Sequence, residues 1–141
     1  MKTKLTSLAL AGLLMSSGAT YAEWSANVGV TNNYLWRGLT QSINEPAIQG
    51  GIDYASDSGF YLGTWASNVS YDSDDAYSYE HDMYFGYAWE AGGVSYDLSY
   101  LYFNYDENAG YDFGEVTAAI GYGNFSASIS CLLYTSDAAD E

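Results

Sequence analysis

The sequence has few of the residues that cross-link small secreted domains through disulfides or that bind nucleic acids. Among 141 residues there are one cysteine, one proline, and three Lys and Arg residues against 18 Asp and Glu residues. A single cysteine excludes an internal disulfide framework, so a core, a barrel or a membrane must supply stability. The formal net charge of −15 excludes binding to nucleic acid through phosphate contacts, because those contacts need Lys and Arg.

Catalytic and metal-binding motifs are also scarce. The only histidine is His81, whereas a histidine-dependent triad needs a neighbouring nucleophile and an orienting acid. No glycine-rich phosphate loop, HExxH motif or Cys/His cluster occurs, and the acidic stretches 72–75 and 106–108 lack the spacing of a calcium loop. We therefore predict that the protein is not an enzyme and needs no cofactor or metal. A lipid-modifying hydrolase barrel is the enzymatic alternative.

The two ends of the chain differ from its middle. A basic start, an apolar run over residues 5–15 and small residues before Ala22 form the pattern of a secretory signal peptide, residues 1–22. Residues 131–141 interrupt the alternation that precedes them and contain the only cysteine. They resemble the translation of a transposase end and adapter used in DNA library preparation, so we predict that they are not native. The alternative is a genuine acidic tail. Residues 23–130 are then an incomplete domain.

The remaining chain alternates apolar and polar residues with a period of two, which predicts strands rather than helices. Most of its seven segments reach the roughly 9–11 residues that a tilted strand needs to cross a bilayer. The segments are 24–36, 47–55, 60–71, 79–90, 94–105, 112–122 and one that begins at residue 124.

Connections between these segments alternate in length. The turns at 56–59, 91–93 and 123–124 are short, and the connections 37–45, 72–78 and 106–110 are longer and more polar. Membrane barrels show this alternation, with short periplasmic turns and longer outer loops, whereas soluble β-sandwiches have no reason to do so. We therefore predict an all-β fold, an antiparallel up-and-down transmembrane β-barrel that is incomplete, with about seven strands.

The two faces of the segments carry different chemistry. One face is apolar, with aromatic residues near the strand ends, where amphipathic rings favour a membrane interface. The candidate interface aromatics are Tyr54, Tyr71, Trp89 and Tyr122. The other face is small and acidic, and lumen carboxylates favour cations unless they are merely solvated. The candidate lumen residues are Asp53, Glu80, Asp82, Asp97 and Glu115.

Arg37 is the only Lys or Arg after residue 4, and it follows an aromatic cluster. We expect it to have a structural role, paired with Glu45 or another acidic neighbour, or to face lipid phosphates. Around it, residues 32–42 (NNYLWRGLTQS) and then 46–54 resemble the TorF family of proteobacterial porins, and residues 59–69 and 80–84 look similar to its next segments. The resemblance spans residues 24–130. It implies an outer-membrane β-barrel and brings no catalytic or ligand residues.

These observations predict an outer-membrane, porin-like channel for passive diffusion of small hydrophilic solutes, with a preference for cations. Its expected partners are outer-membrane lipid and small solutes or cations. Two alternatives stay open, a structural or adhesion barrel that does not conduct and a secreted soluble β-domain.

Overall fold

A computed structural model describes residues 22–71, 78–106 and 112–133, and every regular element among them is a β-strand. The strands are β1 (Glu23–Thr31), β2 (Leu35–Trp36), β3 (Leu39–Thr40), β4 (Ala47–Ala55), β5 (Phe60–Asn68), β6 (Tyr79–Ala91), β7 (Val94–Tyr105), β8 (Phe113–Tyr122) and β9 (Phe125–Leu133). Almost all of the predicted signal peptide, the loop acids at 72–75 and 107–108, and residues 134–141 lie outside the described residues.

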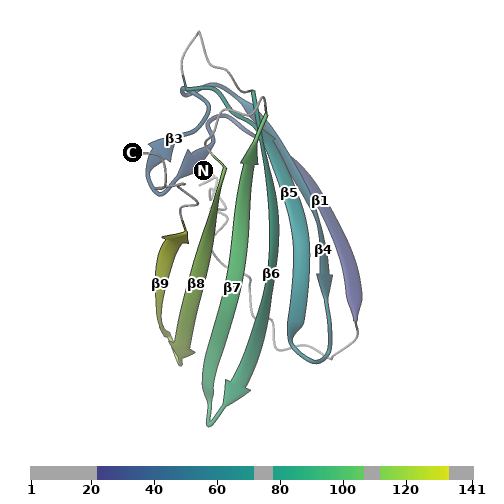
Figure 1. The fold of residues 1–141 in the computed structure, drawn as a ribbon, viewed down its shortest axis with the longest axis vertical. Coiled ribbons are helices and arrows are strands. Elements are labelled where there is room, and N and C mark those ends of the chain that lie inside the picture. Colours follow the sequence, from purple (N-terminus) through teal and green to yellow (C-terminus); the bar gives the residue numbers. More distant parts are fainter. Residues whose placement is uncertain (1–21, 72–77, 107–111, 134–141) are drawn as a thin grey trace, which may run out of the picture.

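Seven strands form one antiparallel sheet in the order β1-β4-β5-β6-β7-β8-β9 (Figure 1). Each long strand pairs with the next long strand along the chain, whether a short turn or a longer connection joins the two. The predicted all-β antiparallel meander is confirmed. The sheet is curved but not closed, and β1 and β9 form its two edges.

The alternation in connection length is also present in the structure. Short turns at 56–59, 92–93 and 123–124 alternate with longer connections at 32–46, 69–78 and 106–112. The turn between β6 and β7 consists of Gly92 and Gly93, whose φ angles are 62° and 77°. Two positive φ angles are what a tight two-residue hairpin requires, and glycine adopts them without steric strain.

Three predicted strand limits are wrong by more than one residue. The first segment ends at Thr31 rather than at residue 36, because the Thr31 hydroxyl donates to the Asn33 carbonyl at 3.0 Å and starts a turn. Residues 35–40 then form the separate hairpin β2–β3. The third segment ends at Asn68 rather than at residue 71. The last strand runs past residue 130 to Leu133, which pairs with Gly114. The proposed foreign origin of residues 131–141 stays a prediction.

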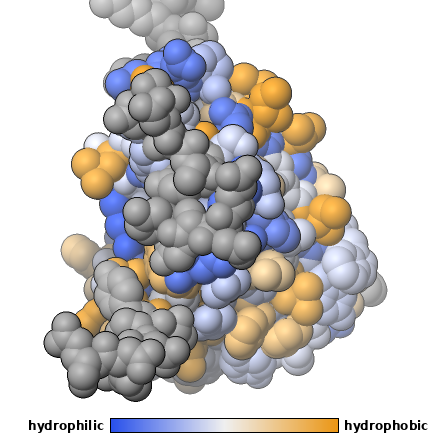
Figure 2. Space-filling view, turned by 45° about the horizontal axis from the view of Figure 1, so that its top comes forward, coloured by the Kyte–Doolittle hydropathy of each residue, from blue (hydrophilic) through white to orange (hydrophobic). Residues whose placement is uncertain are grey.

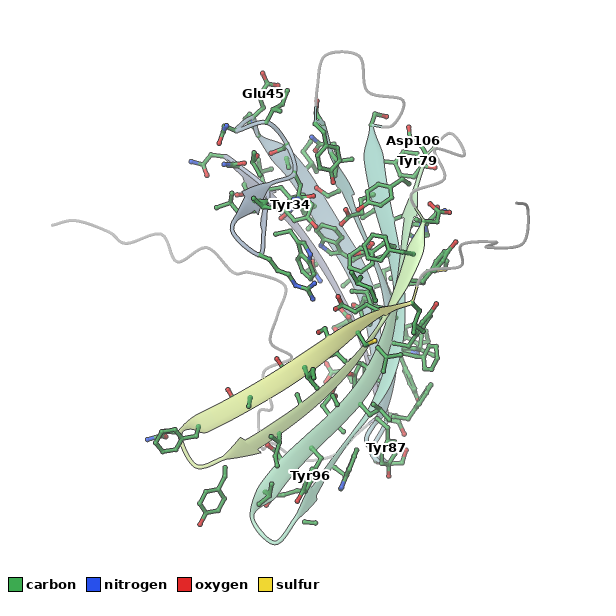
Figure 3. The ribbon with its side chains drawn as sticks, turned by 60° about the vertical axis from the view of Figure 1, so that its left-hand side comes forward. Tyr34, Glu45, Tyr79, Tyr87, Tyr96 and Asp106 are labelled. Atoms are coloured by element: carbon green, nitrogen blue, oxygen red, sulfur yellow. The ribbon has the colours of Figure 1, made fainter. Side chains whose placement is uncertain are left out.

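The sheet has an inner and an outer face, which the register defines. We call inner the concave face on which residues 32–46 pack, and outer the opposite face (Figure 3). Each of the seven long strands contributes one side chain to the inner face and the next to the outer face, as the pleat dictates. One outer row runs across five strands, through Trp24, Tyr54, Leu62, Phe85 and Tyr100.

Burial differs sharply between the two faces. The buried hydrophobic cluster consists of Tyr34, Ala47, Trp65 and Val69, and it lies between residues 32–46 and the inner face. Large apolar side chains are exposed on the outer face, and Figure 2 shows some of them on the right of the molecule, where β1 and β4 lie. The core of this fold therefore lies on the inner face, beneath residues 32–46. It is not formed by a second layer that packs on the apolar outer face.

Candidate functional site: the inner face and the segment across it

The five predicted lumen acids all lie on the inner face, but their burial divides them. Glu80, Asp82 and Glu115 are 2%, 1% and 3% exposed, whereas Asp53 and Asp97 are partly exposed. Charged carboxylates are rarely buried unless they have partners. The partners of these five acids therefore show what the inner face does.

Asp53 receives a hydrogen bond from a tyrosine two strands away. Asp53 on β4, Gly63 on β5 and Tyr84 on β6 form one cross-strand row. The Tyr84 ring lies over Gly63, and its hydroxyl donates to the Asp53 carboxylate. A Cβ atom at residue 63 would lie 2.5 Å from the Tyr84 ring, so this arrangement needs glycine.

The same geometry recurs one strand further along. Tyr61 on β5 lies over Gly86 on β6, and its hydroxyl donates to Asp97 on β7 at 2.8 Å. Together the two tyrosines tie four strands across the inner face and hold both carboxylates in fixed positions. Asp53 and Asp97 still keep exposed surface, so they remain accessible to solvent.

Residues 32–46 cross the inner face instead of extending beyond the sheet (Figure 3). Tyr34 packs edge-on against Trp65, with ring centroids 5.3 Å apart, and its hydroxyl donates to Glu80 at 2.7 Å. Tyr105 donates to the other Glu80 oxygen at 2.7 Å, so this buried carboxylate has two hydroxyl partners. Burial first, and then the neighbouring Glu80 charge, raise the pKa of Tyr34, which keeps its phenol neutral and able to donate.

Glu115 holds the tip of the same segment. The Arg37 Nη2 atom lies 2.7 Å and 2.8 Å from the two Glu115 carboxylate oxygens, and the guanidinium carbon lies 5.0 Å from the Trp36 ring centroid. Trp36 in turn contacts Phe103 on β7, with centroids 5.8 Å apart. Of the options that the sequence left open for Arg37, the structure supports an acidic partner, and that partner is not Glu45.

Asp82 is one of the three buried acids of the inner face, and its hydrogen bonding is incomplete. It lies between Trp65 on β5 and Phe103 on β7 in the same cross-strand row. Its Oδ1 atom is the only buried side-chain oxygen or nitrogen in the described residues that lacks a hydrogen bond. Trp65 and Phe103 contact Tyr34 and Trp36 respectively, so the crossing segment covers both neighbours of this carboxyl group.

Hydrogen bonds within the crossing segment give it a defined shape. The Ser42 hydroxyl accepts from the Tyr34 N–H at 3.0 Å and donates to the Glu45 carbonyl at 2.7 Å. The Ser70 N–H donates to the Gln41 carbonyl at 2.8 Å, which ties the segment to the chain that follows β5. The segment is a folded element, not an open loop.

The predicted interface aromatics divide into three that share a location and one that does not. Tyr54, Trp89 and Tyr122 lie on the outer face, each close to a short turn. Tyr71 follows β5, packs against the buried inner cluster, and donates to Gln41 Oε1 at 2.5 Å. Placing Tyr71 on the outward face was therefore wrong, because the strand that carried the alternation ends three residues earlier.

The outer aromatic group at the short-turn end is larger than predicted. Trp24 packs on Tyr54 with ring centroids 5.1 Å apart, and Tyr96 stacks on Trp89 at the same distance. Tyr87 and Tyr96 lie near this end in Figure 3, far from Tyr34. We call these rings, together with Tyr122, the outer aromatic belt.

Sequence reasoning also missed the tyrosines that hold the acids. Tyr34, Tyr61 and Tyr105 were not singled out, although each donates to an inner-face carboxylate. A usable signal was the glycine directly across the strand pair from a tyrosine, as in Gly86 opposite Tyr61. His81 lies on the outer face with its Nε2 atom 2.6 Å from Thr64 Oγ1, away from the inner carboxylates.

Two common kinds of site are not found in the described ranges. No group of three or more His, Cys, Asp or Glu side chains there is arranged to hold a metal ion. None of those residues form a helix that is long and apolar enough to span a bilayer.

Fold and inner face together define an antiparallel β-meander with a polar, tyrosine-rich concave face and an apolar convex face. The model of a bacterial protein family of unknown function, Gcw_chp, matches residues 15–137, and the chain belongs to this family. No curated protein and no solved structure matches the chain. The suggested membership of the TorF porin family is therefore corrected, because the matching family is a different one and carries no porin assignment.

Proposed function

We propose that the chain forms part of the wall of an outer-membrane β-barrel that passes small hydrophilic solutes. The observation that carries the proposal is the exposure of large apolar side chains on the outer face. Val28, Ile48 and Phe85 there are 82%, 65% and 54% exposed. Contiguous apolar surface of this kind marks a binding partner or a membrane, because water disfavours it by about 25 cal/mol per Å².

Lipid is the partner that fits both the shape and the chemistry of this face. The apolar residues are spread across all seven strands of a curved sheet, whereas a protein partner would cover a compact patch. The outer aromatic belt lies at the short-turn end, where an interfacial girdle is expected in a membrane barrel. The polar inner face then faces the lumen.

Closure of such a barrel needs more than the seven strands of this sheet. Consecutive strands are antiparallel, so β1 and β9 run in the same direction. Joining them directly would create one parallel pair, whereas an antiparallel barrel has an even number of strands. We therefore propose that the wall continues past β9 with an odd number of further strands. Every backbone hydrogen bond in lipid is then satisfied.

Cation preference is part of the same proposal, with a smaller set of residues than the sequence suggested. Glu80 and Glu115 bind side chains of the crossing segment, so they do not face a lumen freely. Asp53 and Asp97 keep exposed surface on the inner face. These two carboxylates are the ones that favour cations in the passage.

The test is planar-bilayer conductance of the full-length protein under a KCl gradient. We expect steady single-channel steps and a reversal potential that indicates preference for K⁺. Preference for Cl⁻ would keep the channel and overturn the assignment of Asp53 and Asp97. A folded, inserted protein without conductance would favour the structural or adhesion barrel, and a protein that stays in the aqueous phase would favour a secreted soluble domain.

A further inference from the structure

The segment between β1 and β4 carries an inference that rests on the proposed function. Residues 32–46 start at one edge of the sheet and reach across to the far strands of the inner face. Their anchors are Tyr34 to Glu80 on β6, Trp36 to Phe103 on β7, and Arg37 to Glu115 on β8. A segment fixed across the concave side of a barrel wall narrows whatever passage that wall encloses.

The backbone of this segment is strained in a way that the rest of the described chain is not. Positive φ angles at residues other than glycine occur among the described residues only at Arg37, Ile43 and Asn44, with values of 48°, 44° and 62°. Such conformations are costly, above all for a β-branched residue such as Ile43, and they cluster at functional sites. The hydrogen bonds of Ser42 and the three anchors hold this backbone in place.

We propose that residues 32–46 form the constriction of the passage, and that the Arg37–Glu115 ion pair sets its width and modulates the charge selectivity that Asp53 and Asp97 provide. The two partners are unequally exposed, with 52% of the Arg37 side chain accessible and 4% of that of Glu115. Arg37 is therefore the partner that presents charge to a solute at the narrowest point. Glu115 neutralises it from the wall and fixes its position.

Two substitutions at this ion pair separate width from charge. Arg37→Ala removes the exposed cation and one anchor, and Glu115→Gln removes the wall charge and weakens the same anchor. Both release the tip of the segment, so both should widen the passage. The local charge changes in opposite directions, because the first variant leaves a carboxylate and the second leaves a guanidinium. Arg37→Lys keeps the charge and serves as the conservative variant.

The experiment records single-channel conductance and reversal potential of the full-length protein and these variants in planar bilayers with KCl. We expect conductance to rise roughly twofold or more in both Arg37→Ala and Glu115→Gln. The reversal potential should shift toward K⁺ in the first variant and toward Cl⁻ in the second. Arg37→Lys should stay near the wild type. Glu45→Gln, in the same segment but outside the ion pair, is the matched control and should leave conductance unchanged.

The outcomes distinguish this inference from the proposed function. If the wild type conducts but neither variant changes conductance, or if both variants shift selectivity in the same direction, the constriction is overturned and the channel stands. A wild type that inserts without conducting overturns both. Tryptophan emission of a variant that retains only Trp36 gives a readout that needs no current. Its emission should shift to longer wavelength in Arg37→Ala, and an unchanged spectrum would contradict release of the segment.

Discussion

The outer and inner faces of this sheet reverse the usual arrangement of a soluble protein. Phe85 and Tyr84 are neighbours on β6, yet the apolar Phe85 is 54% exposed on the outer face and the hydroxyl of Tyr84 lies inside, bonded to a carboxylate. Glu80 and Asp82, on the same strand, are more deeply buried than any large apolar side chain of the outer face. In a soluble domain the order would be opposite. The comparison teaches that burial in this sheet is inverted, as the proposed lipid-facing outer surface requires.

The largest expected effect comes from placing a charge on the outer face. Phe85→Lys puts an ammonium group in the middle of the proposed lipid-facing surface, where Lys costs roughly 2–4 kcal/mol at the bilayer midplane. We expect loss of insertion into vesicles, measured by protease protection and heat-modifiable gel migration. Ser128→Lys is the control, because Ser128 lies on the inner face of β9. Equal insertion of both variants would contradict the claim that the outer face, and not the inner face, contacts lipid.

The inner face should be sensitive to a single added carbon atom. In Gly63→Ala the new Cβ meets the Tyr84 ring at 2.5 Å, so the ring must move and its bond to Asp53 is lost. We expect a loss of about 1–3 kcal/mol in unfolding free energy, measured by urea denaturation of the inserted protein. Gly29→Ala adds the same atom where nothing lies within 4 Å and should be nearly neutral. If Gly63→Ala left the unfolding free energy unchanged, the hydrogen bond from Tyr84 to Asp53 would contribute little to stability.

Two neighbouring acids on β6 should respond in opposite directions. Asp82→Asn replaces a buried carboxyl group, whose Oδ1 atom has no hydrogen bond, by an amide that cannot ionise, so the variant should be more stable, by about 1 kcal/mol. Glu80→Gln weakens the bonds from Tyr34 and Tyr105 and should cost about 1–3 kcal/mol. The same urea titration measures both. Destabilisation by Asp82→Asn would mean that the Asp82 carboxyl group has a stabilising partner.

The smallest effect concerns pH at the long-loop end. Burial opposes ionisation of Asp106, but the N–H groups of Ser78 and Tyr79 and the Ser78 hydroxyl outweigh it and lower the pKa of this carboxyl. A lowered pKa stabilises the fold above the unfolded pKa of Asp, about 3.9, and the contribution is lost as pH falls through the folded pKa. Asp106→Asn should reduce this acid sensitivity by less than about 1 kcal/mol, because the group is solvent-screened. Urea denaturation at several pH values measures the effect. If the unfolding free energies of the wild type and Asp106→Asn depend on pH in the same way, Asp106 does not contribute to the acid sensitivity.

Local pattern predicted most of the fold. β4 and β7 match their predicted ranges, 47–55 and 94–105, because alternation and the flanking turn glycines act over a few residues. The segment 60–71 has large apolar side chains on both faces, so its alternation alone does not distinguish the inner face from the outer face. The structure shows why, since both Tyr61 and Trp65 are large, apolar and buried on the inner side while Phe60 and Leu62 lie outside.

The crossing segment could not be predicted because its partners are distant in sequence. Arg37 and Glu115 are 78 residues apart, and Tyr34 and Glu80 are 46 apart. The alternation of apolar and polar residues continues through Trp36 in the sequence. The predicted first strand therefore extended beyond Thr31, where β1 ends. Only the three-dimensional arrangement shows that several predicted lumen acids serve as anchors. The same contacts explain why an acidic face read from sequence overstated the number of carboxylates open to solutes.

Quenching of tryptophan fluorescence by brominated lipid tests the central claim most directly. The four tryptophans divide evenly, since Trp24 and Trp89 lie on the outer face and Trp36 and Trp65 lie on the inner side. Four variants, each retaining one of them, would be inserted into phosphatidylcholine vesicles brominated on the acyl chains. The account predicts strong quenching of Trp24 and Trp89 and little quenching of Trp36 and Trp65. Equal quenching of all four, or of none, would contradict a lipid-facing outer surface.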